Sequence, residues 1–255
     1  MSPSSLVCSV VVPAHGAARY LPETLGALLD SDVPRDKWEL IVVDDGSLDE
    51  TAAIAGRYAD TVIRLPGPPH GPAYARNRGF EVARGPVVAF FDADVIVHHD
   101  TLRRLLEVLK DRPDVGAVFG AYDTAPRATG LVSQYRNLIH HYVHVRGAGE
   151  VDTFWAGAGA VRRDVFEEAG MYDEWHYARP QIEDIELGAR VRSLGKTILL
   201  VPDIQVTHLK KWSFANVVRT DLRDRGIPWA RLLAQRGATL SAKTLNLRWT
   251  ERLNT

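Results

Sequence analysis

The apolar residues in the first half of the chain form short continuous runs, and each run is followed by a stretch with helical spacing. The runs predict strands over residues 7–12, 39–43, 61–65 and 86–91. The spacing predicts helices over residues 18–29, from about residue 49, over 71–83, and over 100–109 with Asp100 as the cap. Continuous apolar runs are typical of strands that are buried on both faces of a sheet. The alternation therefore predicts a parallel, doubly wound α/β sheet flanked by helices.

The second half of the chain has shorter apolar runs in a less regular order. Strands are predicted over residues 115–119, 151–155, 158–162, 197–201 and 204–208, and helices over 131–145, 164–169 and 185–194. Short strands added to a parallel sheet indicate one mixed α/β domain over residues 1–235, with halves at 6–110 and 111–210. Helix signals continue over residues 214–233 and then fade, so we expect the tail at 236–255 to be loosely held.

The composition is that of an ordinary globular protein, with 45% apolar and 25% charged residues. A net charge of −1 gives no general attraction to nucleic acid or to anionic membranes. No apolar run reaches the roughly 18 residues of a membrane span, and residues 1–5 lack the features of a signal peptide. The one cysteine, Cys8, lies in an apolar run and is predicted to be a core residue in a reducing compartment. These features predict a cytoplasmic protein.

Two aspartates, Asp92 and Asp94, directly follow the apolar run at 86–91. A buried strand cannot hold unpaired carboxylates, because desolvating an ion costs several kcal/mol or more. Both residues are therefore expected just past the carboxyl end of the strand, where open α/β sheets bind their ligands. Two oxygen ligands there suit Mg²⁺ or Mn²⁺ that is partly held by phosphate. The alternative is a capped turn between a strand and a helix.

The other predicted strands of the first half also end in polar or small residues. The segments are Pro-Ala-His-Gly at 13–16, Asp-Asp-Gly-Ser at 44–47 and Gly-Pro-Ala-Tyr-Ala-Arg-Asn at 71–77. In a parallel sheet these carboxyl ends lie along one edge. The sequence therefore gathers several acids, glycines and an arginine at one crevice, and such a cluster requires a cation or hydrogen-bond donors.

Four motifs together resemble family 2 glycosyltransferases of the GT-A fold. They are Val-Val-Pro at 11–13, Val-Val-Asp-Asp-Gly-Ser-Leu-Asp-Glu-Thr at 42–51, Ala-Arg-Asn-Arg-Gly at 75–79 and Phe-Asp-Ala-Asp at 91–94. The match extends from about residue 7 to residue 208. The resemblance implies a Rossmann-like, mostly parallel mixed sheet in which residues 6–110 bind a nucleotide sugar and 111–210 bind the acceptor. It further implies a UDP-type donor, Mn²⁺ or Mg²⁺ as cofactor, and transfer of the sugar to a hydroxyl with inversion.

The resemblance implies donor-binding roles for Pro13, Ala14, Asp45, Gly71, Arg76, Asp92 and Ala93. Pro13 would line the base pocket, and Asp45 would accept a hydrogen bond from the imide N–H of uracil or thymine. Gly71, with Ala75, would let the backbone approach the nucleotide closely. Arg76 would face the diphosphate or, alternatively, lie at the solvated start of a helix. Asp44 fits a structural turn instead.

The resemblance also implies a metal site at Asp94 and His208, whereas Asp92 would contact ribose and the donor sugar. A lone histidine at a strand end is usually structural, so only the family match favours His208 as a ligand. The sequence departs from the family at Ala14-His15-Gly16, where many relatives have an aromatic residue and asparagine. The base and sugar of the donor are therefore not defined by these motifs.

Glu183 and Asp184 open a predicted helix, where acids often serve only as partners of the helix dipole. The pair resembles the catalytic motif of the family, in which the aspartate is the general base. The helix N-terminus is expected to keep Asp184 ionised. Trp155, Gly157 and Trp175 are predicted to contribute to an acceptor site, although small residues can also mark close packing and tryptophan often fills a core.

Two other functions use the same scaffold. A sugar-nucleotide pyrophosphorylase would need a glycine-rich loop after the first strand, which is absent from the sequence. A non-catalytic carbohydrate-binding protein would not need the four residues Asp45, Asp94, Asp184 and His208 together. The acceptor is not identified beyond a carbohydrate, a lipid-linked molecule or a small metabolite. Apolar residues at helical spacing over 245–253 suggest peripheral association with the cytoplasmic face of a membrane.

Overall fold

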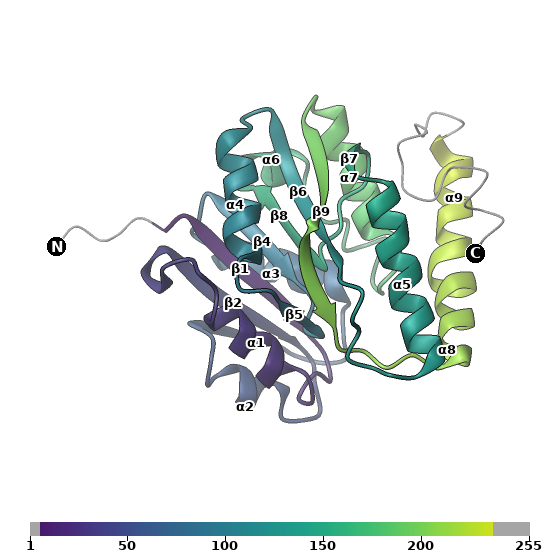
Figure 1. The fold of residues 1–255 in the computed structure, drawn as a ribbon, viewed down its shortest axis with the longest axis horizontal. Helices are drawn as coiled ribbons and strands as arrows, with labels where there is room; N and C mark the ends of the chain where they lie inside the picture. The colour runs from purple at the N-terminus through teal and green to yellow at the C-terminus, as the bar shows by residue number, and fades with distance from the viewer. Residues whose placement is uncertain (1–5, 237–255) are drawn as a thin grey trace.

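A nine-stranded mixed sheet runs through residues 6–236, the part of the chain that this computed structural model describes (Figure 1). The strand order is β3-β2-β1-β4-β8-β6-β9-β5, and β7 pairs with β9 outside this path. The strands are β1 (Cys8–Ala14), β2 (Trp38–Asp45), β3 (Thr61–Leu65), β4 (Val87–Phe91), β5 (Val95–Val97), β6 (Val115–Tyr122), β7 (Gly149–Val151), β8 (Ala158–Arg162) and β9 (Thr197–His208).

The four strands of the first half are parallel, as the sequence predicts. The helices of this half are α1 (Leu21–Leu29), α2 (Thr51–Ala55), α3 (Pro72–Val82) and α4 (Thr101–Asp111). Every residue of β2 is buried, which accounts for its continuous apolar run. Asp100 precedes α4, but its side chain makes no capping hydrogen bond and instead pairs with Arg104 at 3.6 Å.

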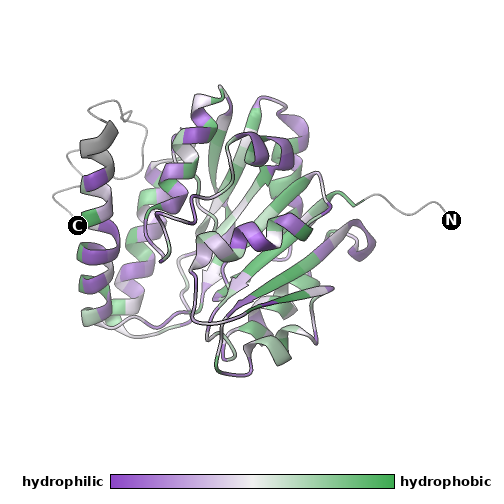
Figure 2. Cartoon of the chain, turned by 180° about the vertical axis from the view of Figure 1, so that it is seen from behind, coloured by the Kyte–Doolittle hydropathy of each residue, from purple (hydrophilic) through white to green (hydrophobic). Residues whose placement is uncertain are grey.

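Successive residues of β1 contribute to two separate hydrophobic cores, because side chains alternate across a strand. Val10 and Val12 pack with α1, α2 and α4 on one face of the sheet. Val11 packs on the other face with α3 and with α6 (Arg163–Glu168) and α7 (Glu183–Ser193). Hydrophobic residues accordingly follow the strands in Figure 2. Cys8 is fully buried, as predicted, and burial raises the pKa of its thiol to about 12.

The structure differs from the sequence prediction in three places, two of them in the second half. The strand predicted at 151–155 is limited to β7, and the residues after it form a loop. The two strands predicted at 197–201 and 204–208 form one continuous strand, β9. Pro202 lies within it, because the β6–β9 ladder is irregular there: Phe119 pairs with Leu200 and Ala121 with Gln205. The short strand β5 was not predicted.

The helical signals at 214–233 correspond to α8 (Phe214–Arg219), the π-helical segment η2 (Thr220–Gly226) and α9 (Ile227–Arg236). This rod lies next to α5 (Leu131–Arg146) at one edge of the molecule (Figure 1). Arg136 of α5 donates two hydrogen bonds to Asp221 of η2, at 3.0 and 2.6 Å. None of the helices described is long and apolar enough to cross a membrane. The predictions for most of the tail and for 245–253 lie outside the described residues.

Candidate active site

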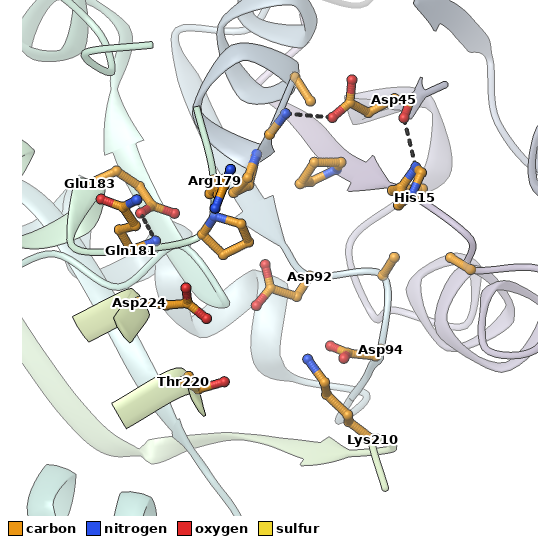
Figure 3. A pocket seen from close by; sticks show the side chains of 18 of the residues that line it. His15, Asp45, Asp92, Asp94, Arg179, Gln181, Glu183, Lys210, Thr220 and Asp224 are labelled. Carbon is orange, nitrogen blue, oxygen red and sulfur yellow. Dashed lines mark hydrogen bonds between the residues drawn. The ribbon is translucent and has the colours of Figure 1, made fainter. Parts of the chain in front are cut away.

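One large pocket, with a volume of about 940 Å³, opens at the carboxyl ends of β1, β2 and β4. The acids predicted to converge from distant parts of the sequence, Asp45, Asp92, Asp94, Glu183 and Asp184, all line it. So do the predicted donor-site residues Pro13, Ala14, Gly71, Arg76 and Ala93. In the view of Figure 3, His15 and Asp45 lie at one end and Glu183 at the other, with Asp92 between them and Asp94 below, beside Lys210. The predicted donor-site residues and the predicted acids therefore belong to one pocket at the edge of the sheet.

Asp45 is buried at the end of β2, where its carboxylate accepts backbone hydrogen bonds. The donors are the N–H groups of His70, at 2.9 Å, and Gly71, at 2.7 Å. The ring Nδ1 of His70 also lies 3.2 Å from Oδ1, so Oδ2 is the oxygen that keeps a second acceptor position among the described contacts. Recognition of a base by Asp45 stays a prediction. The carboxylate of Asp44 accepts the N–H of Ser47 at 3.1 Å, in agreement with its predicted role in a turn.

Gly71 packs against another part of the chain's own backbone, a contact that the sequence did not indicate. Its φ is +101°, and a Cβ there would lie 2.6 Å from the carbonyl oxygen of Ala178. The backbone that approaches Gly71 is therefore the chain's own loop at 178–179, which also lines the pocket. Residue 71 must therefore be glycine, because the loop at 178–179 packs directly against its backbone.

Arg76 lies at the centre of the pocket's acidic groups and is only 4% exposed, which excludes a solvated helix start. Its Nη2 donates to Asp92 Oδ1 at 2.8 Å. Its Nη1 lies 3.6 Å from Glu183 Oε1 and 3.9 Å from Asp184 Oδ1. Burial opposes the charged form, but Tyr172 and the three carboxylates raise the pKa of Arg76 above its ordinary value. Among the described residues, Nη1 and Nε have no hydrogen-bond partner.

Asp184 is fixed by two hydrogen bonds at the start of α7. Its Oδ1 accepts the hydroxyl of Tyr172 at 3.0 Å, and its Oδ2 accepts the N–H of Ala156 at 3.1 Å. Burial raises the pKa of Asp184, although Arg76 works in the opposite direction. The prediction that the helix N-terminus keeps Asp184 ionised stays untested, because burial shifts its pKa in the opposite direction.

Glu183 is also buried, and its Oε2 accepts the N–H of Gln181 at 2.7 Å. Burial and the neighbouring Asp184 carboxylate raise the pKa of Glu183 to about 7. Glu183 and Asp184 thus share one buried arginine. A carboxylate whose pKa is raised is suited to accept a proton, and this applies to both residues.

Asp94 and His208 meet because β5 and β9 are antiparallel neighbours, with Val95 opposite His208. Asp94 Oδ2 lies 3.8 Å from His208 Nε2, and the His208 ring stacks on Tyr122. Burial raises the pKa of Asp94, but His208 and Lys210 outweigh it, so the pKa is lowered overall. Asp92 instead accepts a hydrogen bond from Arg76, so the two aspartates contact different partners, and their role as metal ligands stays a prediction.

The predicted acceptor residues have three different environments. Trp155 lines the pocket and packs against Tyr122 and two histidines of α5. Gly157 is buried beneath it, and a Cβ at that position would lie 2.3 Å from the Trp155 ring. Trp175 is 87% exposed and is not among the residues that line the pocket. Of the three, only Trp155 is placed to contact a ligand there.

The sequence analysis missed one wall of the pocket and the residue that positions Asp184. The wall is formed by α5 and the α8–η2 rod, which contribute Arg136, His140, Arg219, Thr220, Arg223, Asp224 and Arg225. The basic residues at spacings of two to four in the predicted helix 214–233 were the available signal. Tyr172 gave no signal, because its contact with Asp184 depends on the tertiary fold.

The curled, mostly parallel sheet and the pocket of charged residues at its edge define a GT-A type glycosyltransferase fold. The fold resembles a mannosyltransferase, PcManGT from Pyrobaculum calidifontis, solved in complex with GDP-Man and Mn²⁺. The TM-score is 0.70 at 23% identity, covering 94% of this chain and 67% of that one. The fold also resembles Staphylococcus aureus TarS 1–349 in complex with UDP-GlcNAc. The TM-score is 0.62 at 20% identity, covering 81% of this chain and 59% of that one.

Residues 9–170 match the profile of Glycosyl transferase family 2, and the chain belongs to that family. It is 28% identical over 207 residues to the probable glycosyltransferase YdaM of Bacillus subtilis, covering 76% of this chain and 48% of YdaM. It is 34% identical over 172 residues to the glycosyltransferase AglE of Haloferax volcanii, covering 64% and 55%. The chain thus spans about half the length of these curated relatives.

Proposed function

We propose that this chain is an inverting glycosyltransferase that moves a sugar from a nucleotide-diphosphate sugar, of UDP type, to an acceptor hydroxyl. The observation that carries the proposal is the geometry of Asp184. Its carboxylate is fixed by Tyr172 and Ala156, has a raised pKa, and faces the same pocket as Asp45 and Asp94. The single buried cysteine supports the cytoplasmic location predicted from the sequence.

Asp184 is assigned the role of general base. Its carboxylate takes the proton of the acceptor hydroxyl while that oxygen forms a bond to the anomeric carbon. The bond between the anomeric carbon and the diphosphate oxygen breaks on the opposite side, and its electron pair leaves with the nucleoside diphosphate. Attack from the side opposite the leaving group inverts the anomeric configuration. A positioned base typically contributes about 10²–10⁴-fold to the rate.

Arg76 and Glu183 are assigned to positioning rather than to proton transfer. Arg76 contacts Asp92 on the donor side and approaches Asp184 on the catalytic side, so it aligns the two groups. Glu183 makes no hydrogen bond with Asp184 among the described contacts, and the Asp184 carboxylate raises the pKa of Glu183. Both carboxylates face Arg76, which holds them on one side of the pocket.

The chemistry of Asp94 and His208 fits a divalent cation. A carboxylate oxygen and an imidazole nitrogen are suitable ligands for Mn²⁺. Within residues 6–236 no group of three His, Cys, Asp or Glu side chains is arranged for a metal, so phosphate oxygens would have to complete the coordination. When bound, Mn²⁺ or Mg²⁺ would stabilise the negative charge that develops on the leaving diphosphate.

The decisive experiment compares Asp184→Asn with the wild type in a screen of UDP-, GDP- and dTDP-sugars with Mn²⁺. Nucleotide binding is measured by calorimetry, and transfer by release of the nucleoside diphosphate. The variant should bind the nucleotide with unchanged affinity and lose about 10²–10⁴-fold in turnover. Asp203→Asn, at an exposed position in β9, is the matched control. Full turnover by Asp184→Asn would refute the assignment of the base.

A further inference from the structure

The segment from Leu209 to Arg236 differs in charge from the rest of the chain. It contains seven basic side chains and two acidic ones, whereas the whole chain has a net charge of −1. The basic residues are Lys210, Lys211, Arg219, Arg223, Arg225, Arg231 and Arg236, and the acidic ones are Asp221 and Asp224. Charge of one sign concentrated in one segment points to an anionic partner for it.

Three of these residues, Arg219, Arg223 and Arg225, line the pocket from α8 and η2. No ion pair or side-chain hydrogen bond to them is found among residues 6–236. The contrast is with Arg136 of the facing helix α5, whose guanidinium is neutralised by Asp221. The three pocket-facing arginines, hereafter the η2 arginines, therefore present free hydrogen-bond donors to whatever enters the pocket.

The charge of Arg225 is disfavoured where it lies. Desolvation at the pocket wall, followed by repulsion from Arg136, lowers the pKa of Arg225, whereas Asp221 raises it. An anion bound beside a cation favours its charged form. A negative group bound next to the η2 arginines would therefore stabilise the charge of Arg225.

The η2 arginines lie towards the catalytic carboxylates rather than towards the base-binding end. The charge of Arg225 is felt by Glu183 and Tyr122. In Figure 3, Thr220 and Asp224 of η2 lie on the side of Glu183, away from His15 and Asp45. Lys210, by contrast, lies beside Asp94 in Figure 3, where the donor diphosphate is proposed to bind. The anion that the η2 arginines attract is therefore on the acceptor.

We propose that the acceptor carries a phosphate group, as a monoester or diester, and that the η2 arginines bind it beside Asp184. This inference rests on the proposed function. Each guanidinium offers five N–H donors in a planar fork, and one such fork already satisfies the two oxygens of a carboxylate. Several arginines around one ligand match the larger number of oxygens on a phosphate.

The phosphate has two possible sources, a water-soluble acceptor and a lipid. The face of α8–η2 that does not line the pocket exposes Phe214, Val218 and Leu222, at 73%, 39% and 66%. Helix α5 exposes a second set at helical spacing: Leu131, Tyr135, Leu138, Tyr142 and Val145. Apolar side chains next to basic ones are typical of helices that lie on lipid surfaces. Both sources are therefore tested.

The first experiment measures binding of glycerol 3-phosphate, glycerate and glycerol by calorimetry, with saturating UDP and Mn²⁺ already present. Filling the nucleotide site in this way keeps the phosphate probe out of it. Glycerol 3-phosphate should bind, and glycerate and glycerol should bind at least tenfold more weakly. Equal binding of all three, or binding of glycerol 3-phosphate only when UDP is absent, would overturn the proposal.

The second experiment uses the double variant Arg223→Gln/Arg225→Gln. Because a hydrogen bond to a charged group is worth roughly ten- to a hundredfold in affinity, binding of glycerol 3-phosphate should weaken by about that factor. The affinity for UDP should not change. Arg231→Gln, which alters an exposed arginine outside the pocket lining, is the matched control and should behave as the wild type. A loss of UDP affinity in the double variant would instead assign these arginines to the donor.

The third experiment tests the lipid source by sedimentation with phosphatidylcholine vesicles that contain or lack phosphatidic acid. Binding that depends on phosphatidic acid and is lost in the double variant would support a lipid phosphate. Binding of glycerol 3-phosphate alone would support a soluble one, and binding of neither overturns the proposal. UDP binding itself tests the proposed function, so a failure of that function would be seen separately from a failure of the phosphate site.

Discussion

The carboxylates at the two ends of the pocket are held in opposite ways. On the donor side, Asp44 and Asp45 accept hydrogen bonds from backbone N–H groups of nearby turns. On the catalytic side, Glu183 and Asp184 are buried with raised pKa values and depend on one arginine from the other half of the chain. The donor end is therefore electrostatically satisfied before any ligand binds, whereas the catalytic end is not.

The two ends therefore differ in the free-energy cost of their buried charges. Backbone amides stabilise the carboxylates of the donor end without bringing in a second charge, so that cost is low there. The catalytic end combines two desolvated acids with an arginine whose Nη1 and Nε have no partner among the described residues. Functional sites are where such local violations are expected, because reactivity needs groups that are not fully satisfied. Substitutions at each end test this difference between the donor and catalytic carboxylates.

The largest effect is expected for Arg76→Met, which removes the cation shared by both ends. Without it, three carboxylates lose their counter-charge, and an uncompensated buried charge costs about 3–5 kcal/mol in free energy of unfolding. Urea denaturation at pH 7 measures the loss. Arg112→Met is the control, because its pair with Asp114 is half exposed and screened by solvent. A loss for Arg76→Met no larger than that of the control would show that the two ends are independent.

The next effect concerns the pH dependence of stability at Glu183. The folded pKa of about 7 lies above the unfolded value of 4.5, so the folded state binds more protons between these values. Stability is therefore lost as the pH rises from about 4.5 to 7. Glu183→Gln should remove this loss and be more stable than the wild type by roughly 3 kcal/mol at pH 8, with little difference at pH 4.5. Chemical denaturation at both pH values gives the comparison, with the exposed Glu168→Gln as control.

Gly71→Ala tests whether the donor end depends on the loop that closes over it. The added methyl group would overlap the backbone at Ala178 in addition to the cost of a positive φ, so we expect a loss of about 2–3 kcal/mol. Gly67→Ala, at φ +82° with open space around the new atom, should lose only about 1 kcal/mol. Thermal unfolding measures both. Equal losses would mean that the packing of residues 178–179 contributes nothing.

The smallest effect is expected for Tyr172→Phe, which removes a single hydrogen bond to Asp184. Because that bond lowers the pKa of Asp184, its loss should raise the pKa further. The acid limb of the pH profile of kcat/KM should then shift to higher pH, with a loss of about tenfold at pH values on that limb. Tyr58→Phe, far from Asp184 in sequence and outside the pocket lining, serves as control. An unchanged profile would leave Tyr172 with a structural role only.

The donor half was largely predictable from the sequence because its strands are fully buried and therefore continuously apolar. The predicted strand at 61–65 coincides with β3, and β1, β2 and β4 differ only at their ends. The three residues of β5 are too few to show a period, and Pro202 made one strand look like two. In these cases pairing with a neighbour, rather than local preference, decides the structure.

The site was predictable residue by residue but not as a network. Asp45 and Asp94 share one pocket because parallel strands end on one edge, whereas Asp184 was expected there from the family resemblance. The burial of Arg76 among acids could not be read from a helix whose polar positions look solvent-exposed. Two of its three acidic partners, Glu183 and Asp184, come from the other half of the chain, so only the tertiary fold brings them together. The η2 wall was missed for the same reason.

The irregular ladder between β6 and β9 has a consequence for how the histidine at the end of β9 is aimed. Two steps along β6, from Phe119 to Ala121, correspond to five steps along β9, from Leu200 to Gln205. Since side chains alternate, one residue more or fewer in that bulge would turn His208 away from Asp94 and towards the opposite face. The number of residues in this bulge thus determines whether a side chain several positions later points towards the proposed metal site.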